Sequence, residues 1–169
     1  VLSVGAYKIR SINTIIIFFM FLGATNFELI YNFFKGNLIN LINDEELKFY
    51  ILILLVAVLL ISFNINSTIY NNYNISLHYA LFQVISISST TGYAIVDYDT
   101  WPPFSRWILL ILMFIGGSAC STAGGIKVIR IKVLLKKGIE ELYRLIHPRA
   151  IKVVKINNNI ISEEISTSI

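Results

Sequence analysis

A short apolar segment, Ser76–Ser89, leads directly into Thr90-Thr91-Gly92-Tyr93-Ala94 and lies between two segments long enough to cross a membrane. As a helix, Ser76–Ser89 would be about 20 Å long, too short for a hydrocarbon core of about 30 Å. Non-helical backbone at membrane depth is tolerated only where it is buried in protein or lines a water-filled cavity. The pattern therefore predicts a half-helix, capped by Ser76, that dips into the bilayer and is followed by extended backbone that returns.

Composition places the chain in the membrane class. Of its 169 residues, 56% are hydrophobic and 14% are charged, whereas soluble domains carry about 25% charged residues. The chain starts at Val1, which we take to indicate a fragment of a longer protein. Its one cysteine, Cys120, excludes an intrachain disulfide and is expected to be a small buried hydrophobe. We find no nucleophile–base pair and no cluster of metal ligands, which argues against an enzyme.

Charge gives the expected orientation in the membrane. Nine Lys or Arg residues lie between Lys127 and Lys155, whereas residues 65–105 contain none. Because basic segments stay in the cytoplasm, residues 127–155 are expected inside and residues 65–105 outside. The basic stretch directly follows a membrane span, so a nucleic-acid partner is disfavoured.

Two segments before the half-helix are long enough to span the bilayer. Residues 11–34 predict one membrane-spanning helix, and residues 47–65 predict a second. The polar residues 37–46 between them predict a loop that runs into a helix start.

A third long segment, residues 106–137, would be about 45 Å long as one straight helix. It is interrupted by ten successive small residues: Gly116, Gly117, Ser118, Ala119, Cys120, Ser121, Thr122, Ala123, Gly124 and Gly125. Unwound backbone in broken helices lines ion paths, although small residues also let membrane helices pack closely. We favour a flexible interruption that can obstruct or open a pore. A short amphipathic helix is expected from Gly138, and a polar linker over residues 151–169.

Thr90, Thr91, Gly92 and Tyr93 are the candidate ion ligands, through their backbone oxygens. Carbonyl groups in such a segment can replace the hydration shell of a potassium ion. Gly92 allows a positive φ at no steric cost. The C-terminal end of the half-helix carries about half a negative charge, which favours a cation. No charged side chain lies between His78 and Val96, so selection by carbonyl groups fits better than selection by a ring of acids.

Other residues have simpler candidate roles. Lys127 and Arg130 follow the small-residue run and are candidates for the inner pore mouth or a partner contact, although each alone is explained as a positive-inside anchor. Tyr93 is expected to brace the filter from behind. Trp101 and Trp107 are expected in the outer aromatic belt.

Together these motifs resemble the membrane subunit of Trk-type potassium uptake systems, in the TrkH-like branch of the Trk/Ktr/HKT superfamily. The matching motifs are Phe82-Gln83-Val84, Thr90–Tyr93, Trp101-Pro102, the run from Phe114 to Arg130, and His147-Pro148-Arg149-Ala150, together with Phe19–Phe27. The resemblance implies an all-α integral membrane fold with a potassium-channel-like architecture. Four helix–pore-loop–helix repeats surround one pore in this family, and the inner helix is broken.

The resemblance also divides the chain. Residues 1–36 end a preceding repeat, residues 37–46 form a cytoplasmic loop, residues 47–137 form one complete repeat, and residues 138–169 lead toward a next repeat. Within the complete repeat it implies an outer helix over 47–65, a pore helix over 76–89, a filter over 90–95 and an inner helix over 106–137.

By the same resemblance, the function is potassium uptake through filter carbonyl groups at Thr90–Tyr93, gated by the loop Gly116–Gly125. The family often has Gly where Ala123 stands. The transported ion is K⁺, and no bound cofactor is implied. The expected setting is a multi-pass homodimer in the lipid bilayer of the cell inner (plasma) membrane. The expected partner is a cytoplasmic, TrkA-like nucleotide-binding regulatory subunit. Two alternatives stay open: a broken-helix, cation-coupled secondary cotransporter and a non-transporting membrane scaffold.

Overall fold

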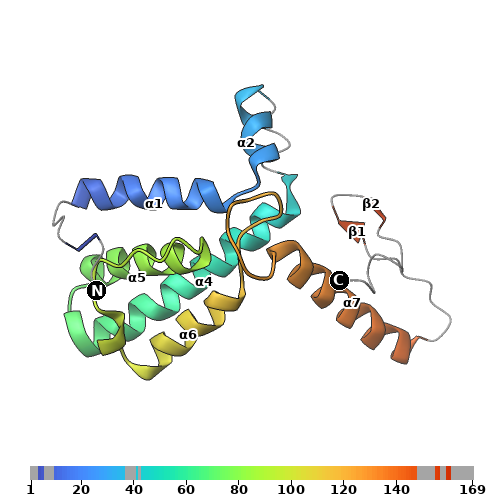
Figure 1. The fold of residues 1–169 in the computed structure, drawn as a ribbon. Helices are drawn as coiled ribbons and strands as arrows, with labels where there is room; N and C mark the ends of the chain where they lie inside the picture. Colours follow the sequence, from blue (N-terminus) through green and yellow to red (C-terminus); the bar gives the residue numbers. More distant parts are fainter. Residues whose placement is uncertain are drawn as a thin grey trace.

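A computed structural model describes residues 4–5, 10–36, 41, 43–147, 155–156 and 159–160, and helices dominate it (Figure 1). The helices are α1 (Arg10–Ala24), α2 (Phe27–Phe34), α4 (Glu45–Ile65), the π-helix η1 (Asn66–Tyr70), α5 (Tyr73–Ser88), the 3₁₀ helix η2 (Tyr98–Thr100), α6 (Pro103–Phe114) and α7 (Val128–Ile146). Two short antiparallel strands follow, β1 (Lys155–Ile156) and β2 (Asn159–Ile160).

The half-helix α5 lies at the centre and packs against α1, α4 and α6 (Figure 1). Its 16 residues give a length of about 24 Å, still too short to cross a bilayer. The predicted cap is wrong: the side chain of Asn72 accepts a hydrogen bond from the Asn74 N–H at 3.1 Å, so the helix begins before Ser76. Ser76 is fully buried, and its hydroxyl donates to the Asn72 carbonyl oxygen.

The first apolar segment is not one straight span, in contrast to the expectation for residues 11–34. Its two helices, α1 and α2, are bent by 106° at the break between them. Asn26 has extended backbone, and its side chain accepts a hydrogen bond from the Glu28 N–H at 2.8 Å, so it caps a new helix that leaves in another direction.

By length and apolar composition, one described helix is able to cross a membrane alone: Glu45–Tyr70, which joins α4 to η1. A second is obtained if the bent pair α1 and α2 is counted as one span. Helix α4 begins before the expected residue 47 because Asp44 caps it, accepting a hydrogen bond from the Leu47 N–H at 2.7 Å.

The third long segment is divided, with α6 ending at Phe114 and α7 beginning at Val128. The expected boundary between residues 137 and 138 is wrong, because α7 runs through Gly138 to Ile146. Open space surrounds Gly138, and a helix tolerates one glycine at a cost of about 1 kcal/mol relative to alanine. Most of the linker expected over residues 151–169 lies outside the described residues.

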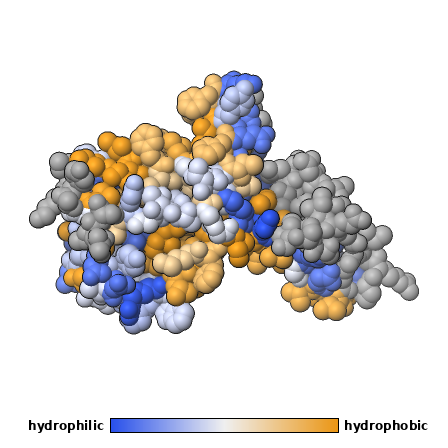
Figure 2. Space-filling view, in the orientation of Figure 1, coloured by the Kyte–Doolittle hydropathy of each residue, from blue (hydrophilic) through white to orange (hydrophobic). Residues whose placement is uncertain are grey.

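Apolar side chains cover parts of the molecular surface. Figure 2 shows hydrophobic residues gathered over α1 and around α6. Phe19 on α1, Leu52 on α4 and Phe114 on α6 are each more than half exposed, as expected for surfaces that face lipid or neighbouring membrane helices. Trp107 is also exposed, whereas Trp101 is 2% exposed and lies in the core. The belt position expected for Trp101 is therefore wrong.

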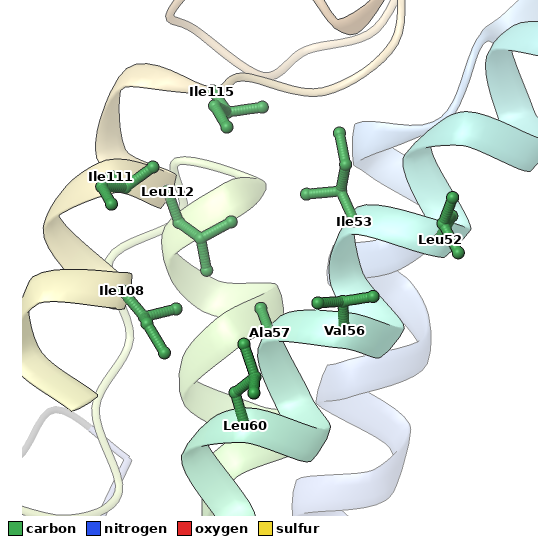
Figure 3. Close-up of a pocket in the computed structure, with 9 residues that line it drawn as sticks. All are labelled: Leu52, Ile53, Val56, Ala57, Leu60, Ile108, Ile111, Leu112 and Ile115. Atoms are coloured by element: carbon green, nitrogen blue, oxygen red, sulfur yellow. The ribbon is translucent and has the colours of Figure 1, made fainter. Parts of the chain in front are cut away.

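A groove of about 300 Å³ runs between α4 and α6 (Figure 3). It is lined by Leu52, Ile53, Val56, Ala57, Leu60, Ile108, Ile111, Leu112 and Ile115. All nine side chains are apolar, so the groove offers no group that would hold a polar solute or a bare cation.

Candidate functional site

The segment Thr90–Tyr93, here called the filter segment, follows the C-terminal end of α5 and turns back beside that helix (Figure 1). The N–H groups of Thr91 and Gly92 both donate to the carbonyl oxygen of Ser86 on α5, at 3.1 and 3.2 Å. In a trans peptide the carbonyl points opposite to the N–H of the next residue, and no described peptide bond is cis. The carbonyl groups of Thr90 and Thr91 therefore both point away from α5.

Two residues in the filter segment have left-handed backbone. The φ of Thr90 is +56° and that of Gly92 is +75°, which confirms the positive φ predicted for Gly92. A non-glycine residue pays about 1–2 kcal/mol for this conformation, so the strain at Thr90 is held by its surroundings. The Thr90 N–H donates to Ile87 at 3.0 Å, and the Thr90 side chain also has a partner, described below.

Two serines, Ser86 on α5 and Ser89 at its C-terminal cap, support the filter segment. The Ser86 hydroxyl donates to the carbonyl oxygen of Tyr93 at 2.6 Å, and the hydroxyl groups of Ser89 and Thr91 lie 2.8 Å apart. The Tyr93 oxygen is thus turned toward α5, unlike those of Thr90 and Thr91. Tyr93 is 42% exposed, and its expected bracing role stays a prediction.

The residues Gly116–Gly125, here called the small-residue loop, are closed at their base. The Gly116 N–H donates to Ile126 at 2.9 Å and the Ile126 N–H to Phe114 at 3.0 Å, which forms an isolated bridge between Ile115 and Ile126. The interruption of the helix is therefore a compact loop with paired ends rather than a loose chain.

Close backbone contacts explain why glycine is present at the start of this loop. A Cβ on Gly116 would lie 1.8 Å from the Gly124 carbonyl oxygen, and one on Gly117 would lie 2.5 Å from the Ala24 carbonyl oxygen. The sequence suggests that these glycines provide flexibility, whereas in the structure they allow two segments to touch. Gly125 has a φ of +75°, which favours glycine for a second reason.

The small-residue loop is attached to α1 and to the filter segment. The Ser118 N–H donates to Ala24 at 2.9 Å, and the Thr122 N–H and hydroxyl both donate to Gly23. The Gly124 N–H donates to the Thr90 hydroxyl at 2.9 Å. The loop therefore lies against the first residue of the filter segment, next to the C-terminal end of α5.

Exposure varies along the small-residue loop. Gly116, Gly117, Ser118 and Ala123 are buried, whereas Cys120, Thr122, Gly124 and Gly125 are exposed. The expected burial of Cys120 is therefore wrong. Its backbone is also left-handed, with a φ of +52°, so the side chain is carried on a tight turn.

The two candidate basic residues have different surroundings. The ammonium group of Lys127 donates back into the loop, to the Ser121 carbonyl and hydroxyl oxygens at 3.3 and 3.4 Å and to the Ala123 carbonyl oxygen. The position of Lys127 at the inner pore mouth stays a prediction. Arg130 lies on the first turn of α7 and is exposed.

Two neighbouring acids on α4 bind the loop and α7, although the sequence marks both only as first-turn residues. The Ala119 N–H donates to Oε1 of Glu46 at 2.6 Å. Glu45 accepts from Lys132 and Lys136 on α7, each at 2.8 Å. The sequence does not mark Ser86 as a support of the filter segment either. No local pattern reveals such contacts, because Glu46 and Ala119 are 73 positions apart.

Comparison with known proteins agrees with this architecture. The family model for TrkH, described as a cation transport protein, matches residues 3–169. Trk system potassium uptake protein TrkH of Salmonella typhimurium is 36% identical over 165 residues, and the Escherichia coli K12 protein of the same name is 34% identical over 168 residues. Each alignment covers 96% of this chain and 34% of the relative.

A solved structure matches as well. The crystal structure of the potassium transporter TrkH from Vibrio parahaemolyticus superposes with a TM-score of 0.90 at 34% identity, covering 99% of this chain and 36% of that chain. This confirms the predicted all-α membrane transporter fold. The chain spans about a third of the length of the relatives it matches. On the match over residues 3–169, the chain belongs to the TrkH family of cation transport proteins.

Proposed function

We propose that this chain contributes one carbonyl-lined filter element to a potassium uptake transporter. The observation that carries the proposal is the pair of N–H groups, on Thr91 and Gly92, that both bind the Ser86 carbonyl oxygen. This arrangement turns successive carbonyl groups away from α5, where they are able to replace water around a dehydrated K⁺. We assign the ion contacts to Thr90, Thr91 and Gly92, with the Tyr93 oxygen shared with the Ser86 hydroxyl.

The small-residue loop Gly116–Gly125 is the proposed gate. It lies against Thr90 through the hydrogen bond from Gly124, at the end of the filter segment nearest the C-terminus of α5. An ion that leaves the filter at this end meets the loop. Conduction therefore needs the loop to move, and the paired ends at Ile115 and Ile126 define the segment that moves.

The proposed orientation in the membrane follows from charge, and the proposed partners follow from the names of the relatives. We place the basic helix α7 in the cytoplasm and the segment between η1 and α6 outside, in a multi-pass protein of the cell inner membrane. The relatives are named as parts of a Trk system, which supports a transporter that works with partner proteins. We propose a nucleotide-binding regulatory subunit and a second copy of the transporter as these partners. Arg130 is the exposed residue that we propose for the partner contact. This activity is transport and not enzymatic catalysis.

A cation-coupled cotransporter of an organic solute is the competing proposal. It would need a polar pocket at membrane depth. The groove between α4 and α6 is lined by apolar side chains throughout (Figure 3), so it does not favour that alternative.

Gly92→Ser in the complete transporter tests the filter. Gly92 has a φ of +75°, and a Cβ added there would meet open space, so serine fits sterically but strains the backbone by about 1–2 kcal/mol. We expect a reduced preference for Rb⁺ over Na⁺ in uptake by potassium-uptake-deficient cells.

Gly36→Ser is the matched control, because Gly36 has a φ of +88° and equally open surroundings but lies at the end of α2. The Gly36→Ser variant should keep the preference for Rb⁺ over Na⁺ of the unmodified protein. An unchanged preference in Gly92→Ser would contradict the filter assignment.

A further inference from the structure

We propose that Glu46 is a positioning residue that holds the small-residue loop in its closed position, and that it thereby sets how often the pore opens. This inference rests on the proposed gate. Glu46 lies in the first turn of α4, and its side chain reaches from that helix to the loop.

Glu46 joins α4 to the small-residue loop. Its Oε1 accepts the Ala119 N–H at 2.6 Å. Ala119 lies near the middle of the loop, four positions after Ile115 of the bridge at its base. Glu46 therefore holds a part of the loop that lies away from the bridge.

Burial makes this contact difficult to break. Glu46 is 5% exposed, so its carboxylate has little access to water. Hydrogen bonds to a carboxylate are about twice as strong as neutral ones, and a buried charge that loses its donor pays the cost of desolvation. When the loop leaves, Glu46 loses the charge-assisted hydrogen bond from the Ala119 N–H, which favours the closed position.

A positive charge holds the same loop from its other end. Lys127 donates to Ser121 and Ala123, two and four positions after Ala119. The loop is thus held by a carboxylate at an N–H group and by an ammonium at carbonyl groups, so each charge binds the backbone group of complementary polarity.

The neighbouring Glu45 provides a matched control. It forms ion pairs with Lys132 and Lys136 on α7, and its side chain is 35% exposed. Loss of the Glu45 charge removes one negative charge from the same turn of α4 but leaves the Ala119 contact in place.

The test uses a buried thiol as a reporter of loop opening. Ser118 is 1% exposed and directly precedes Ala119, so Ser118→Cys combined with Cys120→Ser reacts with a thiol reagent only when the loop moves. We expect Glu46→Ala to raise the reaction rate by at least about fivefold. Rb⁺ flux per folded transporter should rise in parallel, with the preference over Na⁺ unchanged. Glu46→Gln, which keeps one acceptor, should have a smaller effect, and Glu45→Gln almost none.

A purely structural role gives a different result. Reaction rate and flux per folded molecule would then equal those of the unmodified protein, with only the yield of monodisperse transporter reduced, and the proposal would be overturned. If Glu46→Ala does not fold, the thiol reaction rate of Glu46→Gln is used instead. A rate equal to that of the unmodified protein would then overturn the proposal. A faster thiol reaction without any Rb⁺ selectivity would support the loop contact and would count against the filter instead.

Discussion

Gly116→Ala is the perturbation that the structure constrains most tightly. A Cβ at this position would lie 1.8 Å from the carbonyl oxygen of Gly124, whereas real Cβ contacts are essentially never shorter than 3.0 Å. The obstructing atoms belong to backbone, which is not able to rotate away as the end of a flexible side chain would. Gly116 and Gly124 must therefore separate.

The size of this separation decides which hydrogen bonds are lost. The distance must widen from 1.8 to at least 3.0 Å. Two bonds of 2.9 Å hold these residues, from the Gly116 N–H to Ile126 and from the Gly124 N–H to Thr90. A shift of that size takes at least one of them beyond hydrogen-bonding distance. Overpacking typically costs about 1–3 kcal/mol, which corresponds to roughly a 5- to 150-fold change in the population of the closed loop.

The assay measures Rb⁺ uptake per folded transporter together with the thiol reaction of the Ser118→Cys reporter, and both should increase. Gly138→Ala is the control, because open space surrounds Gly138 and alanine there should stabilise α7 by about 1 kcal/mol. Normal flux and a normal thiol rate in Gly116→Ala would refute the claim that close backbone packing keeps this loop closed.

The remaining predictions concern the supports of the filter and the loop. Ser86→Ala removes the hydroxyl that donates to Tyr93 at 2.6 Å, at a cost of about 1 kcal/mol. We expect a weaker preference for Rb⁺ over Na⁺ in competition uptake, with Ser62→Ala on α4 as a buried-serine control. An unchanged preference would show that this hydroxyl does not set the filter. Lys127→Met keeps the apolar stem but removes the donors to Ser121 and Ala123, so the Ser118→Cys reporter should react faster at unchanged ion preference. A thiol rate equal to that of the unmodified protein would mean that Lys127 does not restrain the loop.

Features that depend on local pattern were predictable from the sequence. The length of the half-helix, the positive φ of Gly92 and the interruption of the third long segment all follow from residues close together in the chain. The turn at Asn26 was also encoded locally, by a capping residue with Glu28 two positions later. An apolar run conceals such a turn, because hydrophobicity records burial in lipid or protein but not the direction of the helix axis.

Contacts between distant segments could not be predicted in this way. Glu46 resembles an ordinary first-turn acid until the fold brings Ala119 to it. Gly116 and Gly117 suggest flexibility, because glycine allows many conformations. In the structure, other backbone atoms instead lie so close to these two residues that a Cβ on either one would clash with them. Glycine serves both flexibility and close packing, and only the segment packed against the glycine shows which of the two applies.

The most direct test of the filter is to locate the ion. A structure of the complete transporter with Tl⁺ in place of K⁺, with anomalous diffraction recorded, should show a peak in contact with the carbonyl oxygens of Thr90 and Thr91, on the side away from α5. A Tl⁺ peak bound elsewhere, with none beside these two oxygens, would contradict the account.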